Sequence, residues 1–188
     1  MIRTELIAPI PALLRRHAEA RGDKIAYRDV RGAVTYGALL ATTANLAGHL
    51  QELGVSPGAG VAIFLPNSVE WIQSCVAIGR ADAACVPISY DATLPEIAYR
   101  LADAACRVVI TTDERAEMIE QALAEIPGEK TIILVERGPR FPAHRRFAEL
   151  IGSAPRARPR DSASIDAPSF IIYTSGTKIG RASCRERV

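Results

Sequence analysis

Hydrophobic residues recur along this chain with two alternating periods, one typical of helices and one typical of buried strands. Apolar positions three or four residues apart predict helices over residues 10–20, 36–53, 69–80, 94–104 and 115–126. Short continuous apolar runs predict strands over residues 61–65, 84–88, 107–111 and 131–135. Apolar runs placed between helices indicate parallel strands that are covered on both faces. The pattern therefore predicts an α/β fold in which parallel strands alternate with helices.

Polar residues at the ends of these elements carry the matching start signals. Residues 24–36 alternate in the manner of a β-hairpin. Thr35 and Ser68 are expected to cap the helices that follow them. Thr93 and Glu96 have the spacing of a capping box, in which each satisfies a free backbone donor of the other. These signals place the helix starts independently of the apolar period.

The alternating pattern ends near residue 135. Five prolines between residues 136 and 168 prevent long regular elements, and residues 147–151 are expected to form a single helical turn. Seven arginines lie in the same stretch. We interpret it as a solvated connecting segment rather than as a basic contact surface.

The composition argues against several kinds of partner and site but identifies none. The formal charge is +2, and leaving out the last eleven residues brings it to −1, so no nucleic acid partner is expected. No apolar run reaches the roughly 20 residues of a transmembrane segment, and residues 1–12 lack the continuous apolar run of a signal peptide. The four cysteines form no CxxC pair, which predicts no metal site and favours a cytoplasmic protein.

Candidate chemistry lies in one short segment. Residues 169–173 are expected to form a buried strand, which Thr174, Ser175, Gly176 and Thr177 follow as a hydroxyl-rich turn. Hydroxyl and backbone N–H groups in such a turn can donate to a polyphosphate, and a glycine lets the backbone approach it closely. Many ordinary turns contain the same residues. The turn is not a Walker A loop, because GxxxxGK[ST] occurs nowhere in the chain.

The segment Tyr173-Thr174-Ser175-Gly176-Thr177 resembles the start of the YTSGTTGxPKG loop of the adenylate-forming superfamily. This superfamily includes acyl-CoA synthetases, the adenylation domains of nonribosomal peptide synthetases and firefly luciferase. Upstream segments resemble the family in the same order: residues 35–39 its TYxEL helix start, residues 60–70 its GVAixxpNsxE segment, and residues 87–97 its vPlnp…xxEi segment. The likeness runs from about Leu13 to Thr177.

The resemblance implies the first part of the large N-terminal domain of an adenylate-forming enzyme, incomplete and covering residues 1–177. In this family a carboxylate attacks the α-phosphate of Mg-ATP to give an acyl-adenylate and pyrophosphate, and a thiol, usually coenzyme A, then displaces AMP. The family loop grips the β- and γ-phosphates. That role carries over to Thr174, Ser175, Gly176 and Thr177. The expected partners of the full-length parent are a small-molecule carboxylic acid, ATP, Mg²⁺ and coenzyme A, and its catalytic residues are expected to lie downstream.

The chain departs from the family pattern after Thr177. The family has a second threonine, a glycine and only later a lysine, so Lys178 is not equated with the lysine of the motif. Residues 178–188 show neither apolar periodicity nor likeness to the family. They resemble the translation of a common sequencing adapter, and we expect them to be a non-native tail. A natural alternative C-terminus is the other interpretation.

We expect this chain to be a fragment of an acyl-CoA synthetase-like ligase that acts on a fatty or other carboxylic acid. A fragment of a nonribosomal peptide synthetase adenylation domain is the second interpretation, because residues 60–70 fit either kind of enzyme. A non-catalytic nucleotide-binding or interaction module is the third. We expect the 188-residue chain to be inactive as a ligase. We also expect it to be poorly soluble, since the strand at residues 169–173 would leave an apolar edge exposed.

Overall fold

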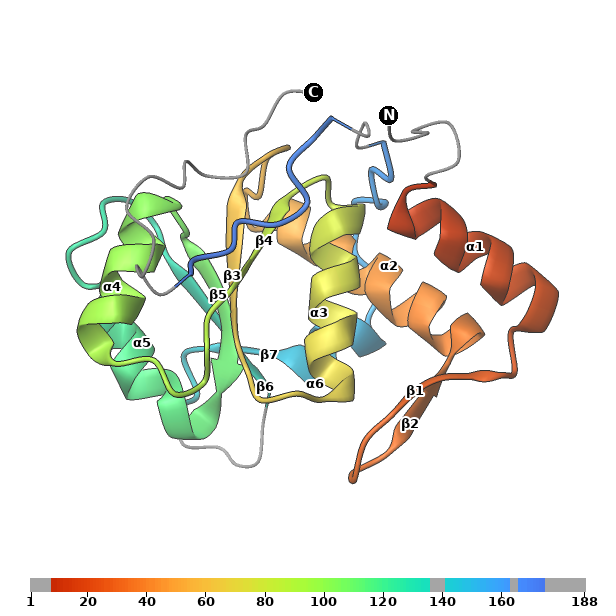
Figure 1. Ribbon diagram of the computed structural model, residues 1–188, viewed down its shortest axis with the longest axis horizontal. Helices are drawn as coiled ribbons and strands as arrows, with labels where there is room; N and C mark the ends of the chain where they lie inside the picture. Colours follow the sequence, from red (N-terminus) through yellow and green to blue (C-terminus); the bar gives the residue numbers. More distant parts are fainter. Residues whose placement is uncertain (1–7, 136–140, 163–165, 175–188) are drawn as a thin grey trace.

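A parallel β-sheet forms the centre of the molecule (Figure 1). The computed structural model describes residues 8–135, 141–162 and 166–174. The strands of the sheet are β3 (Gly60–Phe64), β4 (Ala84–Pro87), β5 (Val108–Thr112), β6 (Thr131–Val135) and β7 (Arg145–Arg146). They lie in the order β4-β3-β5-β6-β7, and every neighbouring pair is parallel. The predicted α/β fold class is confirmed.

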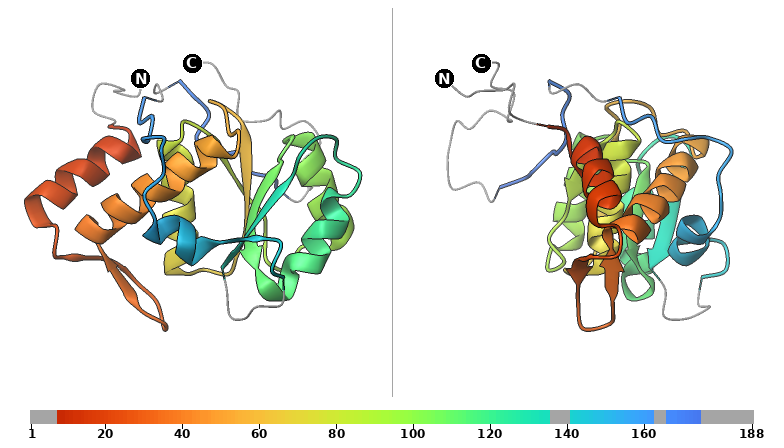
Figure 2. Two further views of the ribbon diagram at one scale, coloured as in Figure 1. Left: turned by 180° about the vertical axis from the view of Figure 1, so that it is seen from behind. Right: turned by 90° about the vertical axis from the view of Figure 1, so that its right-hand side faces the viewer.

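Helices cover both faces of this sheet (Figures 1 and 2). They are α1 (Ile10–Arg21), α2 (Tyr36–Glu52), α3 (Val69–Arg80), α4 (Leu94–Asp103), α5 (Ala116–Leu123) and α6 (Phe147–Gly152). Helices α4 and α5 pack on one face, and α2, α3 and α6 pack on the other. Helix α1 packs against α2, and an antiparallel hairpin of β1 (Ile25–Arg28) and β2 (Ala33–Thr35) joins the two helices.

The predicted start signals of the helices are confirmed in atomic detail. The hydroxyl of Thr35 accepts a hydrogen bond from the backbone N–H of Ala38 at 3.2 Å. Ser68 likewise accepts from Trp71 at 3.1 Å. The carboxylate of Glu96 accepts from the backbone N–H of Thr93 at 2.8 Å. Each bond satisfies a donor that the first turn of a helix leaves free.

Two apolar cores lie on opposite faces of the sheet, because successive residues of each strand point to opposite sides. Ile110 of β5 belongs to the core beneath α2, α3 and α6, whereas Val109 belongs to the core beneath α4 and α5. Cys85 and Cys106 are buried, and Cys75 is half-buried. Burial raises the pKa of the Cys106 thiol to about 12. These two buried cysteines behave as small apolar residues.

Two details of the fold differ from the sequence predictions. Strand β7 was not expected, because its two residues are arginines; it forms through parallel pairing with Ile133 and Leu134 of β6. The helix predicted over residues 115–126 is shorter: a 3-10 turn at Asp113–Arg115 precedes α5, which ends at Leu123. Pro127 disfavours helical backbone in the residue before it, which brings the helix to an early end.

Residues 153–162, here called the connector, lead away from α6 across α2 and α3. The predicted solvated character holds for Arg156 and Arg158, which are exposed. It is wrong for Arg160, whose guanidinium donates to the carbonyls of Val55 at 3.1 Å and Ala81 at 2.7 Å. Backbone carbonyls inside the fold supply these acceptors, and no local pattern marks them in the sequence.

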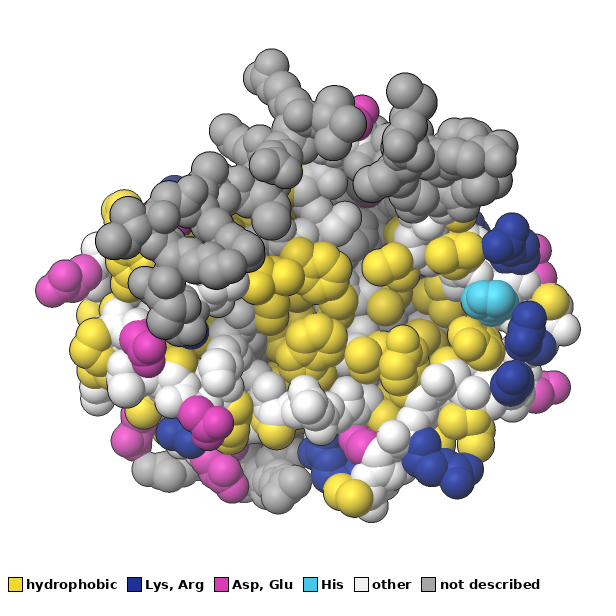
Figure 3. All heavy atoms as spheres, viewed as in Figure 1, with side chains coloured by type: hydrophobic (Ala, Val, Ile, Leu, Met, Phe, Trp, Pro, Cys, Tyr) yellow, Lys and Arg dark blue, Asp and Glu magenta, His cyan; other side chains and the backbone are white. Residues whose placement is uncertain are grey.

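One face of α3 carries apolar side chains that remain partly exposed. Figure 3 shows hydrophobic side chains gathered over this helix. Val69, Ile72 and Val76 on it are only half-buried, as are Trp71 and Cys75. Val69, Ile72 and Val76 pack partly against the small cluster of Leu14 on α1 and Val34 on β2.

Candidate functional site

The segment that leads to the candidate loop lies alongside β4. Phe170 forms an isolated parallel bridge with Cys85. The backbone N–H of Cys85 donates to the carbonyl of Ser169 at 2.9 Å, and the N–H of Ile171 donates to the carbonyl of Cys85 at 2.9 Å. The segment therefore runs in the same direction as the strands of the sheet.

The prediction of a buried strand over residues 169–173 is wrong. Ile171 and Tyr173 pack against the core beneath α4 and α5. Phe170 and Ile172 point the other way and are 37% and 68% exposed. The side chains alternate between two faces, as in a strand. Within the described residues, however, the segment pairs only with β4, and only the face of Ile171 and Tyr173 is packed against the core. Burial on both faces requires neighbours that a local apolar run cannot supply.

The contacts of the segment locate the start of the candidate loop. Phe170 is level with Cys85, near the amino end of β4. Three residues later, Tyr173 contacts Tyr99 and Asp103 in the C-terminal half of α4, and Thr174 follows it and is exposed. Of the predicted site residues, the structure describes Thr174; Ser175, Gly176 and Thr177 lie outside the described residues.

Tyr173 anchors the chain immediately before the candidate loop. Its hydroxyl donates to the carboxylate of Asp103, at the end of α4, at 2.6 Å. Its ring meets that of Tyr99 edge-on, with 6.1 Å between centroids. Burial, and then the bond to Asp103, raise the pKa of Tyr173 above its ordinary value. The tyrosine thus stays a neutral donor near neutral pH, and it joins the entry of the loop to α4.

A separate group of polar residues lies at the carboxyl edge of the sheet, where ligands of open α/β sheets bind. The hydroxyls of Tyr90, which follows β4, and Thr112, which ends β5, are hydrogen-bonded at 2.9 Å. The guanidinium of Arg115 lies 4.8 Å from the centroid of the Tyr90 ring, at cation–π distance. A cavity of about 270 Å³ opens beside them, and the carboxylate of Asp113 lines it. Within the part of the chain that the structure describes, the buried Oδ1 atom of Asp113 has no hydrogen-bond partner.

Sequence reasoning did not select these residues, although a signal was available. Tyr90, Thr112 and Asp113 follow the predicted strands at residues 84–88 and 107–111 almost directly. The carboxyl ends of parallel strands meet at one edge of a sheet, so residues in those positions belong together in space.

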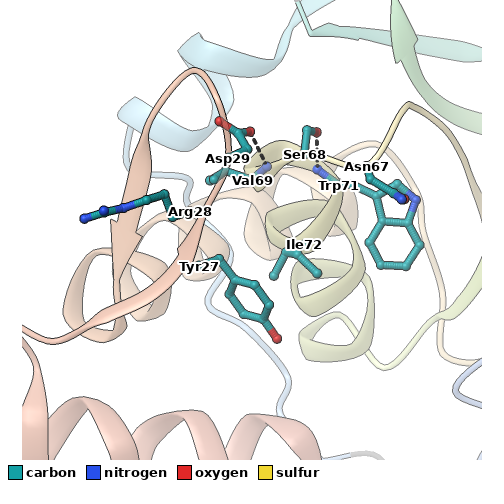
Figure 4. A pocket seen from close by; sticks show the side chains of 8 residues that line it. All are labelled: Tyr27, Arg28, Asp29, Asn67, Ser68, Val69, Trp71 and Ile72. Carbon is teal, nitrogen blue, oxygen red and sulfur yellow. Dashed lines mark hydrogen bonds between the residues drawn. The ribbon is translucent and has the colours of Figure 1, made fainter.

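A second cavity, of about 290 Å³, lies between the hairpin and the start of α3 (Figure 4). Tyr27 and Ile72 line it, and Asp29 stands at its rim. The carboxylate of Asp29 accepts hydrogen bonds from the backbone N–H groups of Val69 at 2.9 Å, Arg31 at 2.7 Å and Gly32 at 2.9 Å. Asp29 is therefore engaged in holding the hairpin against the helix.

Neither a metal cluster nor a membrane span is found in the part of the chain that the structure describes. There, no three or more His, Cys, Asp or Glu side chains are grouped so that they could hold a metal ion. None of the helices there is both long enough and apolar enough to cross a bilayer.

Comparison with known proteins identifies the family. The family model described as AMP-binding enzyme matches residues 14–178. The chain belongs to this AMP-binding family of adenylate-forming enzymes. The match covers the sheet, its helices and the segment beside β4, and it confirms the resemblance that the motifs indicate. Members of the AMP-binding family use ATP, which agrees with a candidate phosphate loop inside the matched residues.

Several known proteins resemble the chain over most of its length. A chalcone synthase of Aspergillus candidus is 33% identical over 94% of this chain and 7% of its own length. A 4-hydroxybenzoate–CoA/benzoate–CoA ligase of Rhodopseudomonas palustris is 30% identical over 87% of this chain and 30% of its own. An anthranilate CoA ligase, solved in complex with anthranoyl-AMP, superposes with a TM-score of 0.86 and 25% identity, over 96% of this chain and 35% of that one. The chain thus spans about a third or less of the length of these proteins.

Proposed function

We propose that this chain is the first part of an acyl-CoA synthetase-like ligase, and that Thr174, Ser175, Gly176 and Thr177 bind the β- and γ-phosphates of ATP. The observation that carries the proposal is the family match, which runs through residue 178 and so includes the hydroxyl-rich turn. The segment that leads to this turn is fixed by its bridge to Cys85 and by the bond from Tyr173 to Asp103. A hydroxyl-rich turn after such a segment can present several donors to one polyphosphate.

In the proposed reaction of the full-length parent, a carboxylate oxygen bonds to the α-phosphorus of ATP and pyrophosphate leaves. Donors on the pyrophosphate stabilise the charge that develops on this leaving group. The thiol of coenzyme A then attacks the acyl carbon, AMP leaves, and a thioester forms. Mg²⁺ would accompany ATP, and a fatty or other carboxylic acid would be the acyl donor. A cytoplasmic location stays a prediction from the sparse, unpaired cysteines.

A nonribosomal peptide synthetase adenylation domain is the second candidate. It shares the adenylation step and differs in the acceptor, a carrier-protein thiol in place of coenzyme A. Residues 60–70 and the start of the loop fit both kinds of enzyme. Transfer of a radiolabelled acyl group to coenzyme A, compared with transfer to a carrier protein, would distinguish the two.

The proposal further assigns residues 1–177 to a partial adenylation domain and residues 178–188 to a non-native tail. Sequencing the genomic DNA past codon 177 tests this. We expect the reading frame to continue with a second threonine and a glycine, as in the family loop. A locus that itself encodes Ile179-Gly180-Arg181 and then stops would refute it.

The 188-residue chain is expected to catalyse no carboxylate-dependent ATP–pyrophosphate exchange, because the residues that complete the site would lie downstream. The protein extended along its native reading frame is expected to catalyse this exchange. In that extended protein, Thr174→Val and Thr177→Val should each lower the exchange rate, by as much as about 10²-fold where the lost hydroxyl contacts the leaving group. Thr131→Val, a change of the same kind at the amino end of β6, serves as the control. Exchange by the 188-residue chain would contradict its proposed inactivity, and full activity of both loop variants would contradict the proposed site.

A further inference from the structure

We propose that Asp161 is a positioning residue for the candidate phosphate loop, because it fastens the connector to the start of β4 and so holds the segment at residues 169–174 against the sheet edge. The proposal rests on the function proposed for that loop. Its physical content, the fastening of the segment, can be tested without any ligand.

Asp161 is held by two arginines from distant parts of the chain. The Nε and Nη2 atoms of Arg80 donate to its two carboxylate oxygens at 3.0 and 3.1 Å, a bidentate arrangement. Arg15 of α1 donates to the same carboxylate at 2.7 Å. Arg80 is only 5% exposed, so Asp161 neutralises a charge that is otherwise costly to bury. This pairing ties the connector to α3 and α1 together.

The position of Arg80 is itself fixed from the other side. Its Nη1 atom donates to the carbonyl of Leu40 at 2.6 Å and to the hydroxyl of Thr43 at 3.0 Å. Both acceptors belong to α2. The guanidinium is therefore held in one position, because the side chain starts on α3 and its Nη1 atom is bonded to α2. The connector attaches to this fixed group.

Three consecutive connector residues bond to three consecutive residues at the junction of α3 and β4. Arg160 donates to the carbonyl of Ala81 at 2.7 Å, and the backbone N–H of Asp161 donates to the carbonyl of Arg80 at 3.1 Å. The backbone N–H of Ser162 donates to the carboxylate of Asp82 at 3.0 Å. Residues 80–82 lead directly into β4, the strand that the loop segment accompanies.

The loop segment pairs with β4 over a short stretch only. The pairing consists of one bridge at Cys85 with two backbone hydrogen bonds, and Tyr173 adds a bond to Asp103, whereas the outward side chains of Phe170 and Ile172 are exposed. Segments with few buried contacts open with low free energy. Fastening at residues 160–162 reduces the number of residues in the loop that the bridge at Phe170 closes, and this lowers the entropy cost of forming the bridge.

Residue-resolved amide hydrogen exchange of the 188-residue chain, without nucleotide, tests the proposal. The reporters are the N–H of Ile171, bonded to Cys85, and the N–H of Cys85, bonded to Ser169. In Asp161→Asn we expect both amides to exchange about tenfold faster or more, and the amides of β5 to be unchanged. Arg15→Met, which leaves the Arg80 pair in place, should give a smaller change at the same amides. Glu149→Gln, in an exposed ion pair with Arg146, is the control and should change neither reporter.

Selective acceleration at Ile171 and Cys85 in both Asp161→Asn and Arg15→Met supports the proposal. Equal acceleration in β5 would show that Asp161 stabilises the whole fold rather than the segment, and would overturn it. Unchanged exchange at Ile171 would overturn it as well. Arg15→Met carries the test if Asp161→Asn does not fold. No nucleotide is present in this experiment, so neither failure bears on the proposed phosphate loop. The ATP–pyrophosphate exchange assay described above tests that loop separately.

Discussion

Asp29 shows how one side chain can join two elements that are far apart in the sequence. Its carboxylate accepts the backbone N–H of Val69 at the start of α3 and those of Arg31 and Gly32 in the hairpin turn (Figure 4). These bonds favour the charged form, so the pKa of Asp29 lies below its ordinary value, with the bond from Val69 as the largest cause.

We expect Asp29→Asn to destabilise the chain at neutral pH, and the difference from the wild type to shrink in acid. A carboxyl whose pKa is lowered by folding contributes stability above its ordinary pKa. That contribution is lost as the pH falls through the lower pKa of the folded state. Urea unfolding at pH 7 and pH 3 measures the difference. Asp23→Asn, at an exposed carboxylate, is the control. A difference that is the same at both pH values would contradict the expectation.

At the scale of elements, the contact between α2 and the connector depends on a glycine. A Cβ atom on Gly48 would lie 2.2 Å from the carbonyl oxygen of Ala157 and 2.4 Å from Cγ of Pro155. Glycine in a helix interior costs about 1 kcal/mol relative to alanine. The close approach of the connector explains why α2 has a glycine at this position.

Gly48→Ala is therefore expected to destabilise the chain by about 1–3 kcal/mol, because the added methyl forces the connector outward. Gly79→Ala is the matched control, since a Cβ there meets open space within α3. That variant should gain up to about 1 kcal/mol from helix propensity alone. Free energies of unfolding in urea measure both changes. A stabilised Gly48→Ala variant would show that the connector does not pack on α2 in solution.

At the scale of the whole molecule, apolar surface gathers on one side. Figure 3 shows hydrophobic side chains gathered over α3, whose apolar face is half-buried. The outward side chains of Phe170 and Ile172 add further exposed apolar surface. Large exposed apolar patches and unpaired strand edges favour association. The prediction of poor solubility thus has a physical basis in the described residues.

We expect the 188-residue chain to self-associate, and Ile172→Glu to reduce this association by placing a charge at the apolar edge. Sedimentation velocity over a range of concentrations measures the effect. Val30→Glu adds the same charge to a fully exposed valine next to the hairpin turn, and should have less effect. A wild-type chain that is monodisperse and melts cooperatively would contradict the prediction.

The sequence by itself determined the elements whose signals are local. Thr35, Ser68 and Thr93 begin helices because a cap needs a donor only a few residues away. The central strands of the sheet were predicted because a continuous apolar run favours a strand that is buried on both faces. The order of the family motifs can also be read without any knowledge of the fold, and it indicated that the chain belongs with the adenylate-forming enzymes.

Only the tertiary structure decided the features that depend on distant partners. Strand β7 exists because β6 offers it an edge, and Arg160 is anchored because carbonyls near residues 55 and 81 converge on it. The burial of residues 169–173 was mispredicted for the same reason, since an apolar run shows what can be buried but not whether neighbours cover it. The pairing of Asp161 with Arg80 joins residues 81 positions apart, a separation at which the residues themselves carry no mutual signal.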